Sequence, residues 1–197
     1  MKIELDIHLK DDWLRPVIYR INGRDVRIAT YPGVFSYGKV DKATDFLLRS
    51  ISFNPKDKVL DLGCGSGVIG VVAATSCPQG EVECVDIDPR AVALTSRNIA
   101  FSKLKNIRVY GSQNYDSVSA SDFTKIIINL PAQVAKPVQQ EMMQQALDHL
   151  RVRGEIYIVA QARLQRFVKR ELKQTVGEVG FVGKESHFVI LRSQKSR

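Results

Sequence analysis

The chain has 197 residues, 44% of them hydrophobic, which suits one packed domain with room for a small appendage. The formal net charge of +8 favours a polyanionic partner and excludes no fold, while three cysteines without a CxxC pair predict reduced thiols in a cytoplasmic protein without a metal site. The charged N-terminus and the absence of a long apolar run argue against a signal peptide and against a membrane span.

The first 30 residues are expected to form a small β appendage. Residues 2–7 alternate apolar and polar side chains, which is the period of a strand. Residues 17–29 contain two alternating arms around Asn22–Gly23, the pair favoured in a type I′ hairpin turn. We therefore predict an appendage over 1–30 and a main domain over 31–197.

Beyond residue 40, helical and strand patterns alternate. Apolar spacing and a first-turn proline predict helices over 41–51, 66–76, 89–102, 137–150 and 163–176. Short apolar runs predict strands over 58–63, 81–88, 107–112, 125–130 and 154–161, followed by a β pair over 180–186 and 187–193. This alternation indicates an α/β fold with a doubly wound, mostly parallel seven-stranded sheet that ends in an antiparallel pair.

The stretch VLDLGCGSG, residues 59–67, connects a predicted strand to a predicted helix. Its glycines allow a tight turn and a close approach of the backbone to a ligand. Dinucleotide sites usually show GxGxxG, whereas this loop has GxGxG after Asp61, and a carboxylate there suits a cationic ligand better than a pyrophosphate. Asp86, at the end of the next strand, can accept hydrogen bonds from a ribose diol.

These segments resemble a known family. VLDLGCGSG and VDIDPRAV resemble motifs I and II of class I S-adenosylmethionine-dependent methyltransferases, which have a Rossmann-like fold. YPGVFSYGKVDKATDFLL is similar to the segment before motif I in the small-domain branch related to bacterial ribosomal RNA guanine-N2 methyltransferases. There PGVFS is followed by an Asp and a Ser or Thr, which correspond to Asp41 and Thr44. The resemblance covers residues 30 to 160 and implies S-adenosylmethionine as cofactor.

The resemblance also implies how the cofactor is held. Gly63, Cys64 and Gly65 would border its methionine part. Asp61 would contact the amino group directly or through water, and Thr44 would lie near the carboxylate.

Further cofactor contacts are implied beyond the glycine loop. Asp86 would hold the ribose, Ile87 would flank the adenine, and Asn129 would border the cofactor. Gln113 replaces the Asp that accepts a hydrogen bond from the adenine amino group in the family, and its amide oxygen can still accept one.

The tetrapeptide NLPA, residues 129–132, falls where the family has Asn-Pro-Pro-aromatic. In the family the Asn oxygen and the next carbonyl orient an exocyclic amine, so Asn129 and Pro131 are the predicted catalytic residues. Leu130 and Ala132 depart from the motif, and Ala132 removes an aromatic face that is worth ~1–3 kcal/mol in base stacking. Either Tyr31, Phe35 or Tyr37 supplies another face, or the target is guanine N7, which needs no amine-orienting site.

The C-terminal part of the chain is basic. Residues 163–197 contain nine Lys or Arg against three Glu. A solvated helix face is the usual reason for such charges, but they can also bind RNA phosphates. The predicted RNA-binding residues on the helix over 163–176 are Arg166, Lys169, Arg170 and Lys173.

Together these features predict an S-adenosylmethionine-dependent methyltransferase acting on ribosomal or transfer RNA, at guanine N2 or N7. One alternative is methylation of a protein side chain such as glutamine, because a similar Asn-Pro-Pro-aromatic site serves that amide. Another is a catalytically silent, cofactor-binding RNA scaffold. Loss of the intact motif and the net charge of +8 favour RNA over protein as the substrate.

Overall fold

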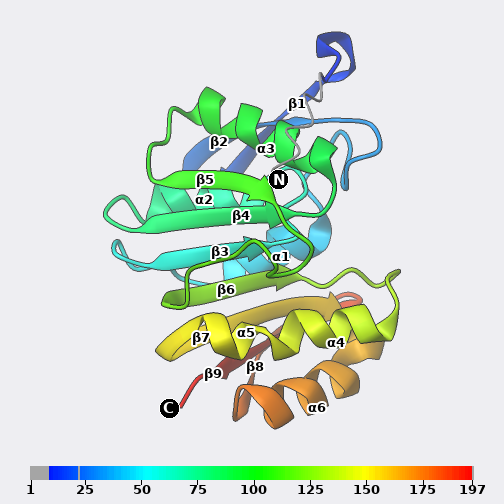
Figure 1. The fold of residues 1–197 in the computed structure, drawn as a ribbon. Helices are drawn as coiled ribbons and strands as arrows, with labels where there is room; N and C mark the ends of the chain where they lie inside the picture. Colours follow the sequence, from blue (N-terminus) through cyan, green and yellow to red (C-terminus); the bar gives the residue numbers. More distant parts are fainter. Residues whose placement is uncertain (1–8, 22, 197) are drawn as a thin grey trace.

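A computed structural model describes residues 9–21 and 23–196. Its centre is a seven-stranded sheet with helices on both faces (Figure 1). The strands are β3 (Lys58–Leu62), β4 (Glu81–Asp86), β5 (Ile107–Gly111), β6 (Phe123–Asn129), β7 (Leu150–Gln161), β8 (Val179–Glu185) and β9 (Phe188–Gln194). The sheet order is β5-β4-β3-β6-β7-β9-β8; the first five strands are parallel, and β9 runs antiparallel to β7 and β8. The predicted fold class is confirmed.

Two apolar clusters cover the two faces of the sheet. The longer helices are α1 (Lys42–Ser50), α2 (Val68–Ser76), α3 (Pro89–Ser102), α4 (Lys136–Gln144) and α6 (Gln165–Thr175). The shorter ones are α5 (Ala146–His149), η1 (Asp11–Trp13) and η2 (Ala162–Leu164). Ile127 packs with α1 and α2, whereas Ile126 and Ile128 pack with α4 and α6, as the two-residue period of a strand requires.

The N-terminal hairpin joins the same core. Strands β1 (Arg15–Ile21) and β2 (Arg24–Thr30) pair antiparallel, with Ile21 opposite Arg24. Tyr19, Ile21, Val26 and Ile28 are buried in one cluster with α1 and α2. The predicted strand over 2–7 and Asn22 of the predicted turn lie outside the described residues. The domain boundary at residue 30 stays a prediction.

Several predicted helices have different bounds in the structure. The helix predicted over 163–176, for example, is α6, which begins at Gln165 after η2. The helix predicted over 137–150 is divided into α4 and α5, and Leu150 already belongs to β7. The helix predicted from residue 66 begins at Val68, because Gly67 has φ = +75° and ends the loop in a left-handed conformation.

A buried ion pair supports the amino ends of the strands, opposite the carboxyl ends of β3 and β6. Lys125 Nζ lies 2.6 Å from Asp57 Oδ2, and Thr124 Oγ1 donates to Asp57 Oδ1 at 2.8 Å. Burial alone would raise the pKa of Asp57. The hydrogen bonds from Lys125, the Asn54 backbone and Thr124 outweigh this and hold that pKa below its usual value.

Replacing Lys125 by Met should destabilise the protein by about 3–5 kcal/mol at pH 7, because it leaves the Asp57 carboxylate buried without its cation. Urea unfolding measures this, with Lys58→Met as the control, since the Lys58 partner Asp122 is exposed. A carboxyl with a lowered pKa stabilises the fold above its unfolded pKa and loses that contribution as pH falls. The difference in the free energy of unfolding between wild type and Lys125→Met should therefore narrow below about pH 4. Equal losses of stability in Lys125→Met and Lys58→Met would contradict the role of the buried ion pair.

Candidate active site

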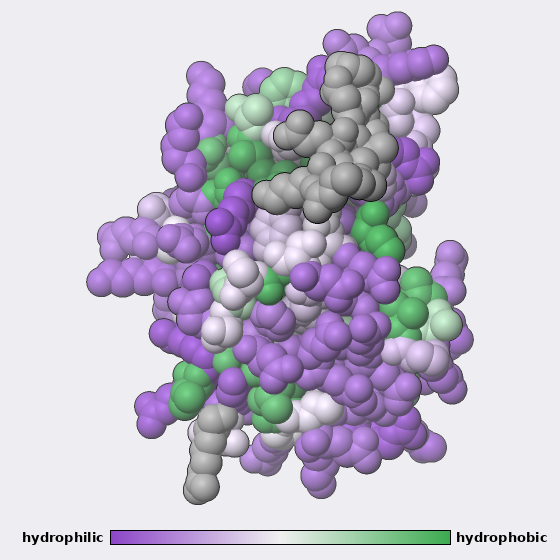
Figure 2. Space-filling model, in the orientation of Figure 1, coloured by the Kyte–Doolittle hydropathy of each residue, from purple (hydrophilic) through white to green (hydrophobic). Residues whose placement is uncertain are grey.

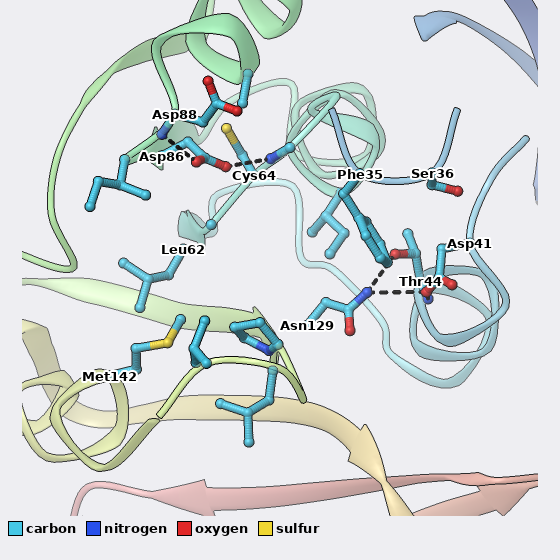
Figure 3. Close-up of a pocket in the computed structure, with 18 of the residues that line it drawn as sticks. Phe35, Ser36, Asp41, Thr44, Leu62, Cys64, Asp86, Asp88, Asn129 and Met142 are labelled. Carbon is cyan, nitrogen blue, oxygen red and sulfur yellow. Dashed lines mark hydrogen bonds between the residues drawn. The ribbon is translucent and has the colours of Figure 1, made fainter. Parts of the chain in front are cut away.

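A cavity of about 810 Å³ lies at the carboxyl ends of β3, β4 and β6, a volume within the range of small-molecule sites (Figure 3). Its walls come from segment 34–44, the glycine loop, the end of β4, the loop after β5 and the loop after β6. Nine of the predicted site residues line it: Thr44, Gly63, Cys64, Gly65, Asp86, Ile87, Gln113, Asn129 and Pro131.

The glycine loop is held against β4. Gly63 and Gly65 have φ values of +76° and +57°, in the left-handed region that favours glycine. The backbone N–H groups of Gly63 and Cys64 both donate to the Val85 carbonyl, at 2.9 and 3.0 Å. The backbone between strand and helix therefore borders the cavity, and Gly63 and Gly65 add no side chain of their own between it and a ligand.

Asp86 connects the end of β4 to this loop. Its Oδ2 accepts from the Gly65 N–H at 2.8 Å, and its Oδ1 accepts from the Asp88 N–H at 2.9 Å (Figure 3). Burial raises the pKa of Asp86, and these backbone hydrogen bonds oppose the rise. Both oxygens keep lone pairs for further donors. Ile87, the next residue, is exposed at the cavity rim.

Asp61 lies beneath the glycine loop and does not line the cavity. The residue is only 1% exposed, and its Oδ2 accepts from the Gly70 N–H of α2 at 3.0 Å. Its Oδ1 has no hydrogen-bond partner among the described residues. Burial raises the pKa of Asp61 to about 7. Of the two modes expected for this residue, contact through water suits its position better than direct contact.

The amide of Asn129 is fixed by the first turn of α1. Its Nδ2 donates to Thr44 Oγ1 at 3.0 Å and to Asp41 Oδ2 at 3.2 Å (Figure 3). Asp41 is the N-cap of α1, and the same Oδ2 accepts from the N–H groups of Ala43 and Thr44. Because the amide nitrogen is engaged by α1, Asn129 presents its Oδ1 to the cavity as an acceptor.

The loop after Asn129 explains one departure from the family motif. Leu130 is buried in the cluster with α4 and α6, and its N–H donates to the Val159 carbonyl at 2.9 Å. A proline at this position could not donate that hydrogen bond. The Pro131 carbonyl accepts from Gln139 Nε2 at 2.7 Å, which fixes the loop from the other side.

The three aromatic residues considered as stacking surfaces differ in position. Tyr31 is buried, and its ring centroid lies 6.1 Å from that of Trp13. Tyr37 is exposed but does not line the cavity. Phe35 lines the cavity and points toward Asn129 and Thr44 (Figure 3).

Two residues of α3 that sequence reasoning missed position the glycine loop. Thr95 Oγ1 donates to the Gly65 carbonyl at 3.0 Å, and Asn98 Nδ2 donates to the Ser66 carbonyl at 2.8 Å. Asn98 also exchanges two hydrogen bonds with the backbone of Ala29 in β2. The signal was available, because both polar residues fall on the apolar stripe of a predicted helix, where buried polar groups need partners.

The predicted RNA-binding cations lie outside the cavity. Arg166, Lys169, Arg170 and Lys173 are exposed on α6, which packs against α4. Arg170 also forms an ion pair with Glu171, a buried carboxylate, at 2.7 Å. The face shown in Figure 2 is mostly hydrophilic, with separate hydrophobic patches.

Within residues 9–21 and 23–196, no three His, Cys, Asp or Glu side chains gather as a metal site would require. The helices of the same part of the chain are too short or too polar to cross a membrane.

The strand order and the glycine loop define the architecture of class I methyltransferases. The family model described as methyltransferase small domain matches residues 25–192, and the chain belongs to this family.

Several known proteins are similar to the chain. An uncharacterized protein of Bacillus subtilis, YbxB, is 29% identical over 90% of both chains. Ribosomal RNA small subunit methyltransferase C of Vibrio vulnificus is 32% identical, over 93% of this chain and 54% of its own length. A solved structure of a T. thermophilus 16S rRNA N2 methyltransferase (RsmC) with AdoMet and guanosine is 26% identical with a TM-score of 0.83, over 93% of this chain and 51% of that one. The chain thus spans about half the length of these ribosomal RNA methyltransferases.

Replacing Asp86 by Ala should weaken binding of S-adenosylhomocysteine at least about tenfold, because a charge-assisted hydrogen bond contributes ~1.5–3 kcal/mol. The change also removes the acceptor for the Gly65 and Asp88 N–H groups. Calorimetry measures the affinity, and Asp116→Ala, an exposed carboxylate outside the cavity, is the control. Unchanged affinity in Asp86→Ala would remove Asp86 from the site.

Proposed function

We propose that the protein is an S-adenosylmethionine-dependent RNA methyltransferase that acts on the exocyclic N2 amine of a guanine in small-subunit ribosomal RNA. The observation that carries the proposal is the Asn129 amide, whose nitrogen is bound by Asp41 and Thr44 and whose oxygen is available at the cavity. The similarity to a guanine-N2 ribosomal RNA methyltransferase supports the choice of amine and RNA. A cytoplasmic location stays a prediction.

The residues present fit S-adenosylmethionine. The volume of the cavity suits a nucleoside-sized ligand, and the left-handed glycines let the backbone approach it closely. Asp86 would hold the ribose diol, and its carboxylate at the cavity suits a ligand with positively charged groups. When bound, S-adenosylmethionine supplies an electrophilic methyl group on its sulfonium.

Asn129 performs two tasks in this proposal. A guanine amine has its lone pair delocalised into the ring, and an acceptor for its N–H groups rotates that lone pair toward the incoming carbon. Asn129 Oδ1, with the Leu130 carbonyl beside it, would accept these hydrogen bonds and stabilise the positive charge that develops on nitrogen. The hydrogen bonds from Nδ2 to Asp41 and Thr44 polarise the amide and make its oxygen a stronger acceptor. The methylated amine is then a strong acid, so no strong base is needed before transfer.

Replacing Asn129 by Ala should raise the barrier of methyl transfer by roughly 2.7–4 kcal/mol while the affinity for S-adenosylhomocysteine stays within about threefold of wild type. Single-turnover rates on undermethylated small-subunit ribosomal RNA, together with calorimetry, measure both quantities. Nucleoside analysis of the product identifies the methylated atom.

The outcomes separate the alternatives. A large rate loss with intact cofactor affinity supports an amine target. A small loss would contradict it and favour a ring nitrogen such as N7, whose lone pair is already available. Transfer to protein but not RNA would support a protein side chain, and binding of both ligands without transfer would support a silent scaffold.

The cations of α6 give a second prediction. Changing Arg166, Lys169 and Lys173 to Glu should weaken RNA binding and reduce the slope of log affinity against log salt by about 2–3, because each phosphate contact contributes about 0.7–0.9. Arg170 is left unchanged because its replacement would leave the buried Glu171 carboxylate without its cationic partner.

The control for this experiment makes the same charge change elsewhere. Lys56, Lys103 and Lys105 are exposed in the loops that precede β3 and β5, at the opposite ends of these strands from the cavity. Reversal of these three to Glu should leave the salt slope closer to that of wild type. Equal effects of both triple variants would show that α6 attracts RNA only through net charge.

A further inference from the structure

We infer that Phe35 supplies the aromatic face on which the target base stacks, in place of the aromatic residue that the chain lacks at Ala132. This inference rests on the proposed function and adds a residue that positions the substrate. It also explains why the loop after β6 can carry Ala132 where the family has an aromatic residue.

The exposure of Phe35 is the first observation. Its side chain is 63% exposed although it lines the cavity, so a large apolar ring faces solvent beside the predicted acceptor site. Figure 3 shows the ring directed at Asn129 and Thr44, the pair that leaves the Asn129 oxygen available. A flat heterocycle whose amine meets Asn129 Oδ1 would therefore have this ring within reach of its face.

The residues on both sides of Phe35 are held by packing and hydrogen bonds. Val34, the preceding residue, is buried against Ala91 and Leu94 of α3, and its N–H donates to the Tyr31 carbonyl at 3.1 Å. Ser36, the following residue, has φ = +67° and donates through Oγ to the Lys39 carbonyl at 3.0 Å. An exposed ring between two fixed residues loses little backbone entropy when a ligand covers it.

The loop after β6 forms another part of the cavity wall. Ala132 and Pro131 line the cavity on the loop after β6, and neither carries an aromatic ring that would compete for the base. Leu130 also borders the cavity, but its side chain is buried in the cluster with α4 and α6. In the proposed arrangement, the target base stacks on the Phe35 ring, and its amine meets Asn129 Oδ1 at the same cavity.

The experiment compares Phe35→Ala, Phe35→Trp and the double variant Phe35→Ala with Ala132→Phe. Methyl transfer is measured on undermethylated small-subunit ribosomal RNA, and calorimetry measures S-adenosylhomocysteine affinity. We expect Phe35→Ala to lower kcat/KM roughly 5- to 100-fold, as loss of one base–aromatic contact predicts, mainly through KM. Phe35→Trp should retain activity, and the ring at position 132 should restore part of the loss. Phe181→Ala, which removes a similarly exposed ring of β8, is the control and should have no effect.

Two results would overturn the inference. If Phe35→Ala weakens S-adenosylhomocysteine binding as much as it weakens transfer, the ring covers the cofactor and does not stack on the base. If transfer is unchanged in Phe35→Ala, the ring has no role in substrate binding. Both results can be obtained only if the wild-type protein methylates RNA. A wild type that methylates no RNA would reject the proposed function itself.

Discussion

The site depends on one carboxylate oxygen, Asp41 Oδ2. This atom caps α1 by accepting two backbone N–H groups, and it also accepts from the Asn129 amide. The cap is firm because Phe46, Leu47 and Leu48 of α1 are buried in the core. The direction of the Asn129 oxygen is therefore set by the packing of a helix, and the acceptor needs no ligand to be oriented correctly.

Two carboxyl groups determine the electrostatics of the cavity where it borders β3 and β4. Asp61 and Asp86 lie near the carboxyl ends of the neighbouring parallel strands β3 and β4, so the sheet brings two carboxyls to one edge, where burial raises the pKa of both. Buried carboxyls close together are unfavourable without cations or donors nearby. The glycine-loop N–H groups satisfy part of this need, and a cationic ligand would satisfy more. The local electrostatics of the site thus oppose the basic charge of the chain as a whole.

The sequence predicted the strands of the mostly parallel sheet and most of the residues that line the cavity, because both follow from local patterns. Apolar periodicity identified the sheet strands, and the carboxyl ends of parallel strands must meet at one edge. The depth of Asp61 could not be read from its position before a glycine, since it depends on the packing of α2. Likewise, the burial of Tyr31 beside Trp13 and the exposure of Phe35 depend on tertiary packing, and the hydrogen bond from the Leu130 N–H depends on β7.

The hydrogen bonds of Asn98 connect the N-terminal hairpin to the glycine loop, so the hairpin is more than a module attached to the domain surface. One amide is bound to the backbone of β2 at Ala29 and to the glycine loop at Ser66, so the two segments keep a fixed spacing. A graft that replaces β1 and β2 with a hairpin of another length would have to reproduce the Ala29 backbone position to within a few tenths of an ångström. For protein engineering, the interchangeable unit in this chain therefore begins before the hairpin, and the ligand loop and β2 have to be moved together.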